Sequence, residues 1–269
     1  MRNPLPAVFF SLAFAICACF PLAAQTQTQG DSSARGIRET DRLFLSFAEE
    51  ATLVDRQWWE GQVELQDGSG FDAKILNLVA AFQPWAQVEF GGRVGFGRTD
   101  TPGAVPDGSG ATDLDAWAKY HFGKGGATEF AAGFLATIPT GDDAVGLGVD
   151  AFAIGVFGSV RHQSERYMLT GNIGANINGD GRVFGLNING ENSLTAAAGV
   201  LIPTGRRVSF VGEARLETER FTGADSDTRI LGGINLGIGS GGVFRAALAL
   251  GLSDGAPDGQ LIAGYAATF

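Results

Sequence analysis

The sequence has little charge, few basic residues and no long apolar run after residue 24. Charged residues make up 18% of the 269 residues, whereas soluble domains carry about 25%. The 19 Lys and Arg against 29 Asp and Glu leave a net charge of -10. This balance disfavours nucleic acid as a partner, because phosphate binding needs clustered Lys and Arg. A membrane-spanning helix needs about 20 consecutive apolar residues, so membrane helices are not expected after residue 24.

Cysteine is also scarce, because Cys17 and Cys19 are the only two in the sequence. Both fall within an apolar stretch that follows Arg2 and ends at Pro21-Leu22-Ala23-Ala24. A basic start, an apolar centre and small residues before a polar segment predict a signal peptide over residues 1–24. An uncleaved anchor and a lipoprotein attached through Cys19 are the alternatives. A secreted chain without disulfides must rely on its backbone ladder and packing.

Glycine and phenylalanine, in contrast, are abundant, with 41 Gly and 20 Phe. The aromatic content excludes a disordered chain. Interior Gly costs about 1 kcal/mol relative to Ala in a helix, so long helices are excluded too. We expect an all-β chain, with a polar N-terminal periplasmic segment over residues 25–56 and one β-domain over residues 57–269.

From Trp58 onward, segments of about ten residues alternate apolar with polar or tiny side chains and end in Gly, Pro, Asp or Asn. Alternation of period two indicates strands with one face in an apolar medium. Twelve strands are predicted, although ten or fourteen also fit the length. Residues 151–160 are apolar on both faces, so their sides are not assigned. The predicted strands are residues 59–65, 76–82, 88–96, 113–122, 130–138, 151–160, 167–177, 194–202, 208–216, 230–238, 244–252 and 261–269.

Connection lengths and aromatic positions favour a barrel in lipid over a secreted β-sandwich. Short connections alternate with mostly longer, more acidic ones, which is typical of outer-membrane barrels. An aromatic residue lies beside nearly every short turn, and the last strand ends on Phe269. The fold class predicted is an all-β, transmembrane, antiparallel up-and-down β-barrel in the outer membrane. Its expected partners are membrane lipids, lipopolysaccharide and, through the Phe269 strand, the barrel-assembly machinery.

If the apolar faces meet lipid, the opposite faces place a set of charged side chains in the lumen. One interpretation is a permeation path with a field that favours cations. The other is that these groups pair across strands and close a narrow barrel, because an apolar wall cannot leave charges unpaired. The alternating run 213–217 favours local pairing. Besides Glu60 and Glu64, the candidate lumen residues are Glu89, Arg93, Asp113, Asp115, Lys119, His121, Glu129, Glu213, Arg215, Glu217 and Arg245.

No catalytic residue, cofactor or metal ligand is predicted. A lipid hydrolase would need a nucleophile with a base in reach, and the sequence has only His121 and His162. Along a strand Asp115 lies about 20 Å from His121. The Asp-Gly and Asn-Gly clusters of the connections could bind divalent cations that bridge to lipopolysaccharide, but turn chemistry explains the same residues.

Three stretches resemble a known family. Trp117-Ala118-Lys119-Tyr120, the segment Phe134 to Asp142 and Asn172-Ile173-Gly174-Ala175-Asn176 are similar to the MetA-pathway of phenol degradation family. The resemblance implies an outer-membrane barrel associated with uptake of aromatic or hydrophobic compounds. The chain departs from the family pattern at Leu43-Phe44-Leu45, where a Pro-containing stretch is usual.

The function expected from the sequence is therefore a channel or transporter for passive uptake of a small-molecule solute, with aromatic or hydrophobic compounds as candidates. The alternative is a narrow closed barrel with a structural or adhesive role through its acidic outer connections.

Overall fold

The computed structural model describes residues 38, 40–68, 72–101, 107–122 and 126–269. The predicted signal peptide and residues 25–37 and 39 of the predicted polar segment lie outside these residues. None of the helical turns in the described ranges is long and apolar enough to cross a membrane.

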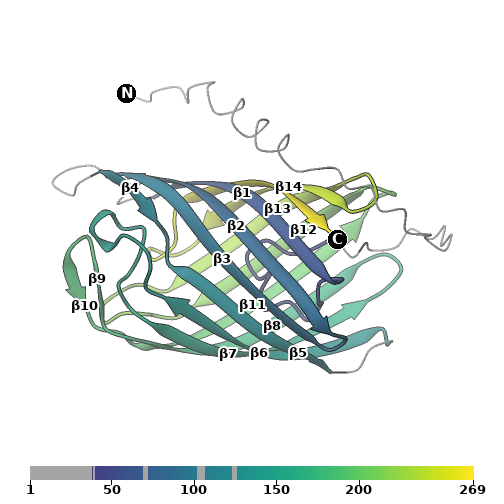
Figure 1. Ribbon diagram of the computed structural model, residues 1–269, viewed down its shortest axis with the longest axis horizontal. Coiled ribbons are helices and arrows are strands. Elements are labelled where there is room, and N and C mark those ends of the chain that lie inside the picture. The colour runs from purple at the N-terminus through teal and green to yellow at the C-terminus, as the bar shows by residue number, and fades with distance from the viewer. Residues whose placement is uncertain (1–37, 39, 69–71, 102–106, 123–125) are drawn as a thin grey trace, which may run out of the picture. The chain divides into compact units, whose positions relative to one another are not determined.

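Residues 57–269 form a closed antiparallel barrel of twelve strands, as predicted (Figure 1). Each strand pairs with its neighbours in the chain, and the barrel closes where β1 pairs with β15. The barrel strands are β1 (Gln57–Asp67), β2 (Asp72–Trp85), β3 (Val88–Asp100), β5 (Leu114–Phe122), β6 (Thr128–Ile138), β7 (Ala153–Gln163), β8 (Met168–Asn178), β11 (Asn192–Pro203), β12 (Val208–Glu217), β13 (Asp227–Ile238), β14 (Gly242–Gly251) and β15 (Gly259–Thr268).

The connections alternate in length, as the sequence predicts. Those after β2, β5, β7, β11 and β13 are short, and both barrel ends of the chain lie at this short-turn end. Most connections at the other end are long and carry structure of their own. There lie β4 (Gly108–Ala111), which pairs with β3, the hairpin of β9 (Gly181–Val183) and β10 (Leu186–Ile188), and the 3-10 turn η1 (Asp143–Val145).

Burial alternates with period two along each barrel strand, which separates an outward from an inward face. In β7 the sequence left the faces unassigned. The structure turns Ile154, Val156 and Val160 outward and buries Phe157 in the lumen. Gly133 of β6 makes this possible, because a Cβ at that position would overlap the Phe157 ring.

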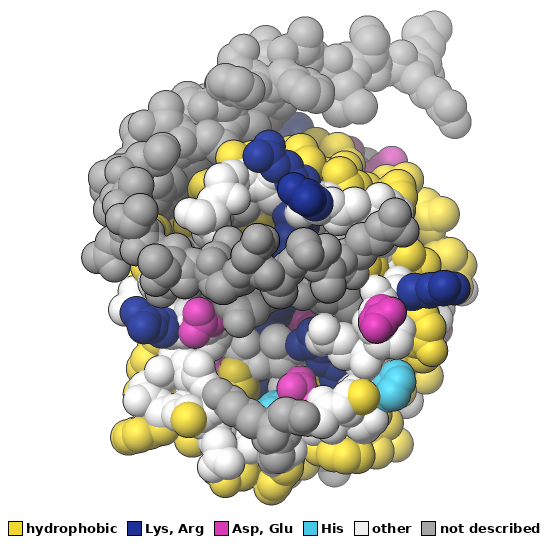
Figure 2. Space-filling view, turned by 90° about the vertical axis from the view of Figure 1, so that its right-hand side faces the viewer, with side chains coloured by type: hydrophobic (Ala, Val, Ile, Leu, Met, Phe, Trp, Pro, Cys, Tyr) yellow, Lys and Arg dark blue, Asp and Glu magenta, His cyan; other side chains and the backbone are white. Residues whose placement is uncertain are grey.

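Large apolar side chains cover the outward face. Viewed from the short-turn end, hydrophobic side chains gather along the right and lower edges of the barrel (Figure 2). Aromatic side chains are exposed beside the short turns, and Phe82 stacks on Phe90 with a centroid distance of 5.7 Å. Trp59 and Trp85 join this belt, although the sequence analysis did not include them. An apolar band bordered by aromatic residues is typical of a barrel in a bilayer.

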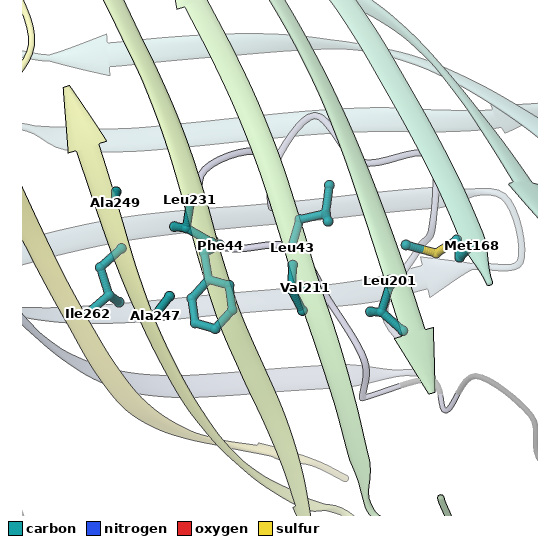
Figure 3. Packing of buried hydrophobic residues seen from close by; sticks show 9 residues of the cluster. All are labelled: Leu43, Phe44, Met168, Leu201, Val211, Leu231, Ala247, Ala249 and Ile262. Carbon is teal, nitrogen blue, oxygen red and sulfur yellow. The ribbon is translucent and has the colours of Figure 1, made fainter. Parts of the chain in front are cut away.

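The apolar core lies inside the barrel, between its wall and the segment that precedes β1. Figure 3 shows Leu43 and Phe44 of that segment against inward side chains of β8 and β11 to β15. This differs from the periplasmic segment expected for residues 25–56, since residues 40–56 occupy the lumen. The physical reason is that this stretch carries Leu43, Phe44, Phe47 and Val54, whose side chains are all buried.

A pair of glycine substitutions checks the inward and outward faces. A Cβ at Gly91 of β3 would overlap the buried ring of Trp117, whereas Gly61 of β1 faces open space. We expect Gly91→Val to lower the free energy of unfolding by about 1–3 kcal/mol through overpacking, and Gly61→Val to leave it unchanged or slightly raised. Urea unfolding of the refolded barrels measures both, and equal losses would contradict the assigned faces.

Candidate functional site

Residues 40–56, called the plug below, fill the short-turn half of the lumen. The chain enters at that end, where Arg38 donates a hydrogen bond to the Asn235 carbonyl of β13 (3.4 Å). It returns to the same end, where Gln57 begins β1 and lies opposite Phe82. The plug is therefore a loop that turns inside the barrel, and both of its ends are on one side.

Within the plug, a buried ion pair and an aromatic side chain fix the turn. Arg42 Nε lies 3.0 Å from Glu50 Oε2, and neither side chain is exposed. The Arg42 guanidinium also donates to the Thr52 carbonyl (2.9 Å) and lies 4.7 Å from the Phe47 ring centre. Phe47 in turn packs between Trp58 and Trp117 of the wall, at centroid distances of 5.3 and 5.9 Å.

Five predicted lumen residues hold the plug from the wall: Glu89, Lys119, Glu213, Arg215 and Arg245. Glu213 accepts hydrogen bonds from the backbone N–H groups of Phe44, Leu45 (3.0 Å) and Ser46 (3.3 Å).

Glu89 and Lys119 bind the returning half of the plug. Glu89 accepts from Val54 N–H (2.6 Å) and from the Trp117 indole N–H (3.0 Å). Lys119, which pairs with Glu89 at 3.0 Å, donates to the backbone carbonyls of Glu50 and Thr52. Both charged groups are fully buried, and each is satisfied by the other and by plug backbone.

Arg245 binds the entering half. Its guanidinium pairs with Glu60 of β1 at 2.6 Å and donates to the carbonyls of Arg42 (3.2 Å) and Leu43. It also lies 4.3 Å from the Phe44 ring centre. Arg245 therefore joins the wall and the plug in one buried network.

Between the plug and the long connections lies a partly open cavity of about 490 Å³. Phe44, Leu45, Phe47, Ala48 and Glu49 of the plug line its inner end. Its wall combines amide side chains with charged groups and with apolar side chains such as Ile75 and Leu135. Six more of the predicted lumen residues line it, namely Glu60, Glu64, Arg93, Asp113, Asp115 and Glu217, and Arg215 and Arg245 reach it from the plug side.

Seven carboxylates and five guanidinium groups line this cavity, and the guanidinium groups are paired. Arg93 pairs with Asp115 (2.6 Å), Arg215 with Glu49 of the plug (2.9 Å) and Arg220 with Glu217 (3.5 Å). Arg229 pairs with Asp227, and Arg245 with Glu60. Glu64 accepts hydrogen bonds from the amides of Gln66, Asn77 and Gln260. The pairing interpretation of the lumen charges therefore describes the structure, with a difference in partners. Two charges of the run 213–217, Glu213 and Arg215, bind the plug rather than each other.

The connection between β6 and β7 borders the cavity at its outer end. Asp113 holds this connection by accepting hydrogen bonds from the N–H groups of Gly141 and Val149, both at 2.9 Å. Leu147 of the same connection is buried and lines the cavity. From the neighbouring hairpin, Arg182 pairs with Asp150 at 2.7 Å and with Asp143 at 3.6 Å. The hydrogen bonds that Arg182 donates to Asp150, with the charge of Asp143, raise the pKa of Arg182 above its ordinary value.

The remaining two predicted lumen residues, His121 and Glu129, lie at the short-turn end away from the cavity. His121 Nε2 is 3.6 Å from Glu129 Oε2, which is also 4.0 Å from Arg161 Nη1. The thirteen candidate lumen residues thus form three groups: one on the plug, one on the cavity and one beside β7. The sequence pattern did not predict the plug or two arginines of the cavity, Arg220 and Arg229.

The closed barrel with an apolar exterior and a polar, plugged lumen has the architecture of porin-like outer-membrane barrels. Solved structures with this architecture include the COG4313 outer membrane channel from Pseudomonas putida F1, at a TM-score of 0.66 and 18% identity over 82% of this chain and 97% of that chain. The KdgM porin in complex with disordered oligogalacturonate is similar at a TM-score of 0.54 and 10% identity, over 79% of this chain and 99% of that chain. The NanC porin is similar at a TM-score of 0.56 and 8% identity, over 78% of this chain and 100% of that chain. At these identities the likeness shows the fold. No protein-family model matches the sequence, and no curated protein matches it either.

Proposed function

We propose that this protein is a non-enzymatic channel of the outer membrane for passive uptake of small molecules. The observation that carries the proposal is the cavity of about 490 Å³ inside a closed barrel whose exterior is apolar. The named structural neighbours are channels and porins, which agrees with this proposal.

The proposed orientation puts the short turns and both ends of the barrel in the periplasm and the long connections outside the cell. Solute then enters the cavity from outside and meets the plug. At the outer rim, Lys74 and Arg98 flank Asp100 at 3.0 Å each. We propose that these cations contact lipopolysaccharide phosphates, since a Lys at a barrel rim can reach the headgroups. The barrel-assembly machinery would bind the strand that ends near Phe269.

The cavity lining suggests a solute that is part polar and part apolar. Polar side chains such as Asn77, Asn176 and Gln260 line part of the cavity, while Ile75 and Leu135 offer apolar contact. Aromatic compounds that carry polar groups combine these properties. The resemblance of the sequence to the MetA-pathway of phenol degradation family supports the same class of solute.

A second candidate function is a closed barrel with a structural or adhesive role. The observation in its favour is that the plug and the ion pairs leave the short-turn half of the lumen filled. In this case the outer connections, such as the one that contains Arg182 and the β9–β10 hairpin, would carry the function.

Planar-bilayer recording of the refolded full-length mature chain separates the two. A channel is expected to show discrete openings, and proteoliposomes should take up a labelled phenolic compound faster than protein-free liposomes. Protein that is folded, as judged by heat-modifiable migration on a gel, yet silent in both assays would overturn the channel proposal in favour of the closed barrel.

A further inference from the structure

The wall of the lumen binds the plug mainly through its backbone. Glu213 and Glu89 accept from four backbone N–H groups of the plug. In return, Arg245, Lys119 and Asn235 donate to backbone carbonyls between Arg42 and Thr52. The wall therefore presents matched acceptors and donors to a polypeptide backbone, as a peptide-binding site does.

Glycines in the wall make room for the apolar side chains of the plug. A Cβ at Gly199 of β11 would lie 2.9 Å from Leu43 Cδ2, and a Cβ at Gly233 of β13 would lie 2.9 Å from Phe44 Cε2. Any larger residue at these two positions would push the plug away from the wall. The strands are thus shaped to receive the plug as a fitted occupant.

Water can nevertheless replace the polar contacts between the plug and the wall. Beside the apolar contacts of Leu43, Phe44 and Phe47, the wall holds the plug by hydrogen bonds and ion pairs, whose loss is offset by hydration when the groups separate. Among the described residues, three buried polar atoms of the plug have no hydrogen-bond partner, namely Arg42 Nη1, Glu50 Oε1 and Thr52 Oγ1. Such atoms gain partners when the plug leaves, which lowers the cost of leaving.

The path of the chain also permits withdrawal. Since the plug enters and leaves at the short-turn end, it can move out on that side as a loop, without threading and without breaking a strand pair. Withdrawal would join the cavity to the periplasmic side through the barrel.

We propose that the plug is a removable stopper, an intramolecular peptide ligand of the lumen whose withdrawal on the short-turn side opens the channel. This inference rests on the proposed function, because it describes how that same lumen would open and close. Closure is then the bound state of residues 40–56 and opening the unbound state.

A reversible cross-link tests the stopper. The only cysteines of the sequence, Cys17 and Cys19, fall in the predicted signal peptide, so engineered ones have no competitors in the mature chain. The variant Leu43→Cys with Gly199→Cys places two thiols across the contact between plug and wall, because a Cβ at position 199 points at the Leu43 side chain. Under oxidant we expect the open probability in planar bilayers to fall at least tenfold, and dithiothreitol to restore it in the same membrane.

The matched control joins wall to wall. Ser159→Cys with Asn172→Cys links directly opposed inward residues of β7 and β8, and oxidation there should leave the openings unchanged. Openings that persist in the fully oxidised plug variant, with the disulfide verified by mass spectrometry, would overturn the stopper but leave the channel standing. Silence in both the reduced and oxidised states, and in the unmodified chain, would instead count against the channel itself.

A second measurement does not depend on forming the disulfide. The Leu43 side chain is 1% exposed, so Leu43→Cys in a fixed plug would stay protected from a charged, membrane-impermeant maleimide. A removable plug predicts slow but complete labelling of the folded barrel. Protection that lasts as long as the barrel stays folded would overturn the proposal.

Discussion

Replacing Ile173 by arginine is expected to lower the free energy of unfolding of the barrel in a bilayer by about 2–4 kcal/mol, the cost of a charge on the lipid face at mid-depth. Ile173 lies at the middle of β8 and is 71% exposed. In water such an exposed position tolerates a charge at little cost. The size of the loss therefore reports which medium surrounds the barrel.

Leu186 provides the matched control, because it is 70% exposed but lies in β10 within an outer connection. Leu186→Arg should change the free energy of unfolding by no more than about 0.5 kcal/mol, as other surface substitutions do. Urea titration of both variants in phospholipid vesicles, followed by tryptophan fluorescence, gives the comparison. Similar small effects at the two positions would argue against a lipid-facing exterior.

Sequence periodicity was sufficient to predict the barrel wall. A strand alternates its side chains strictly, so each residue's face follows from its parity, and Lys119, expected in the lumen, is buried there. Periodicity failed only for β7, where both faces are apolar. There the face is set by a contact with another strand, the space that Gly133 leaves for Phe157.

The plug was beyond the reach of the same reasoning. Its contacts join residues far apart in the chain, as in the bond between Phe44 and Glu213, and no local pattern encodes them. One signal was present in the sequence. Leu43-Phe44-Leu45 is an apolar cluster in an otherwise polar segment, and such a cluster needs a surface to pack against. The partners of Glu213 and Arg215 were missed for the same reason, since they lie on the plug.

Replacing Arg245 by alanine is expected to raise the open probability of the channel and to destabilise the barrel. Arg245 is 2% exposed and carries the ion pair with Glu60 and the hydrogen bonds to the Arg42 and Leu43 carbonyls. Its removal leaves the Glu60 carboxylate buried without a cation, which costs about 3–5 kcal/mol for a buried pair. Movement of the plug lets water reach Glu60 and relieves most of that cost.

The comparison variant is Arg93→Ala, which removes another guanidinium of the lumen. The ion pair of Arg93 with Asp115 lies on the cavity, and the Arg93 side chain is half exposed. Exposed pairs contribute about 0–1 kcal/mol, and the guanidinium of Arg93 donates its hydrogen bonds to Asp115 of the wall, so the open probability should stay near that of the unmodified chain. Planar-bilayer recording and urea titration of the two variants test both halves of the expectation.

Adding Glu60→Gln to Arg245→Ala separates the two roles of Arg245, which are to balance the charge of Glu60 and to donate hydrogen bonds to the plug. The amide removes the uncompensated charge, so most of the lost stability should return. The plug carbonyls of Arg42 and Leu43 still lack the donor that held them, although Asn235 continues to bind Arg42. If backbone recognition holds the plug, the double variant is therefore stable but opens more often than the unmodified chain. If stability and open probability return together, charge balance in the wall keeps the plug in place, and the hydrogen bonds from Arg245 contribute little.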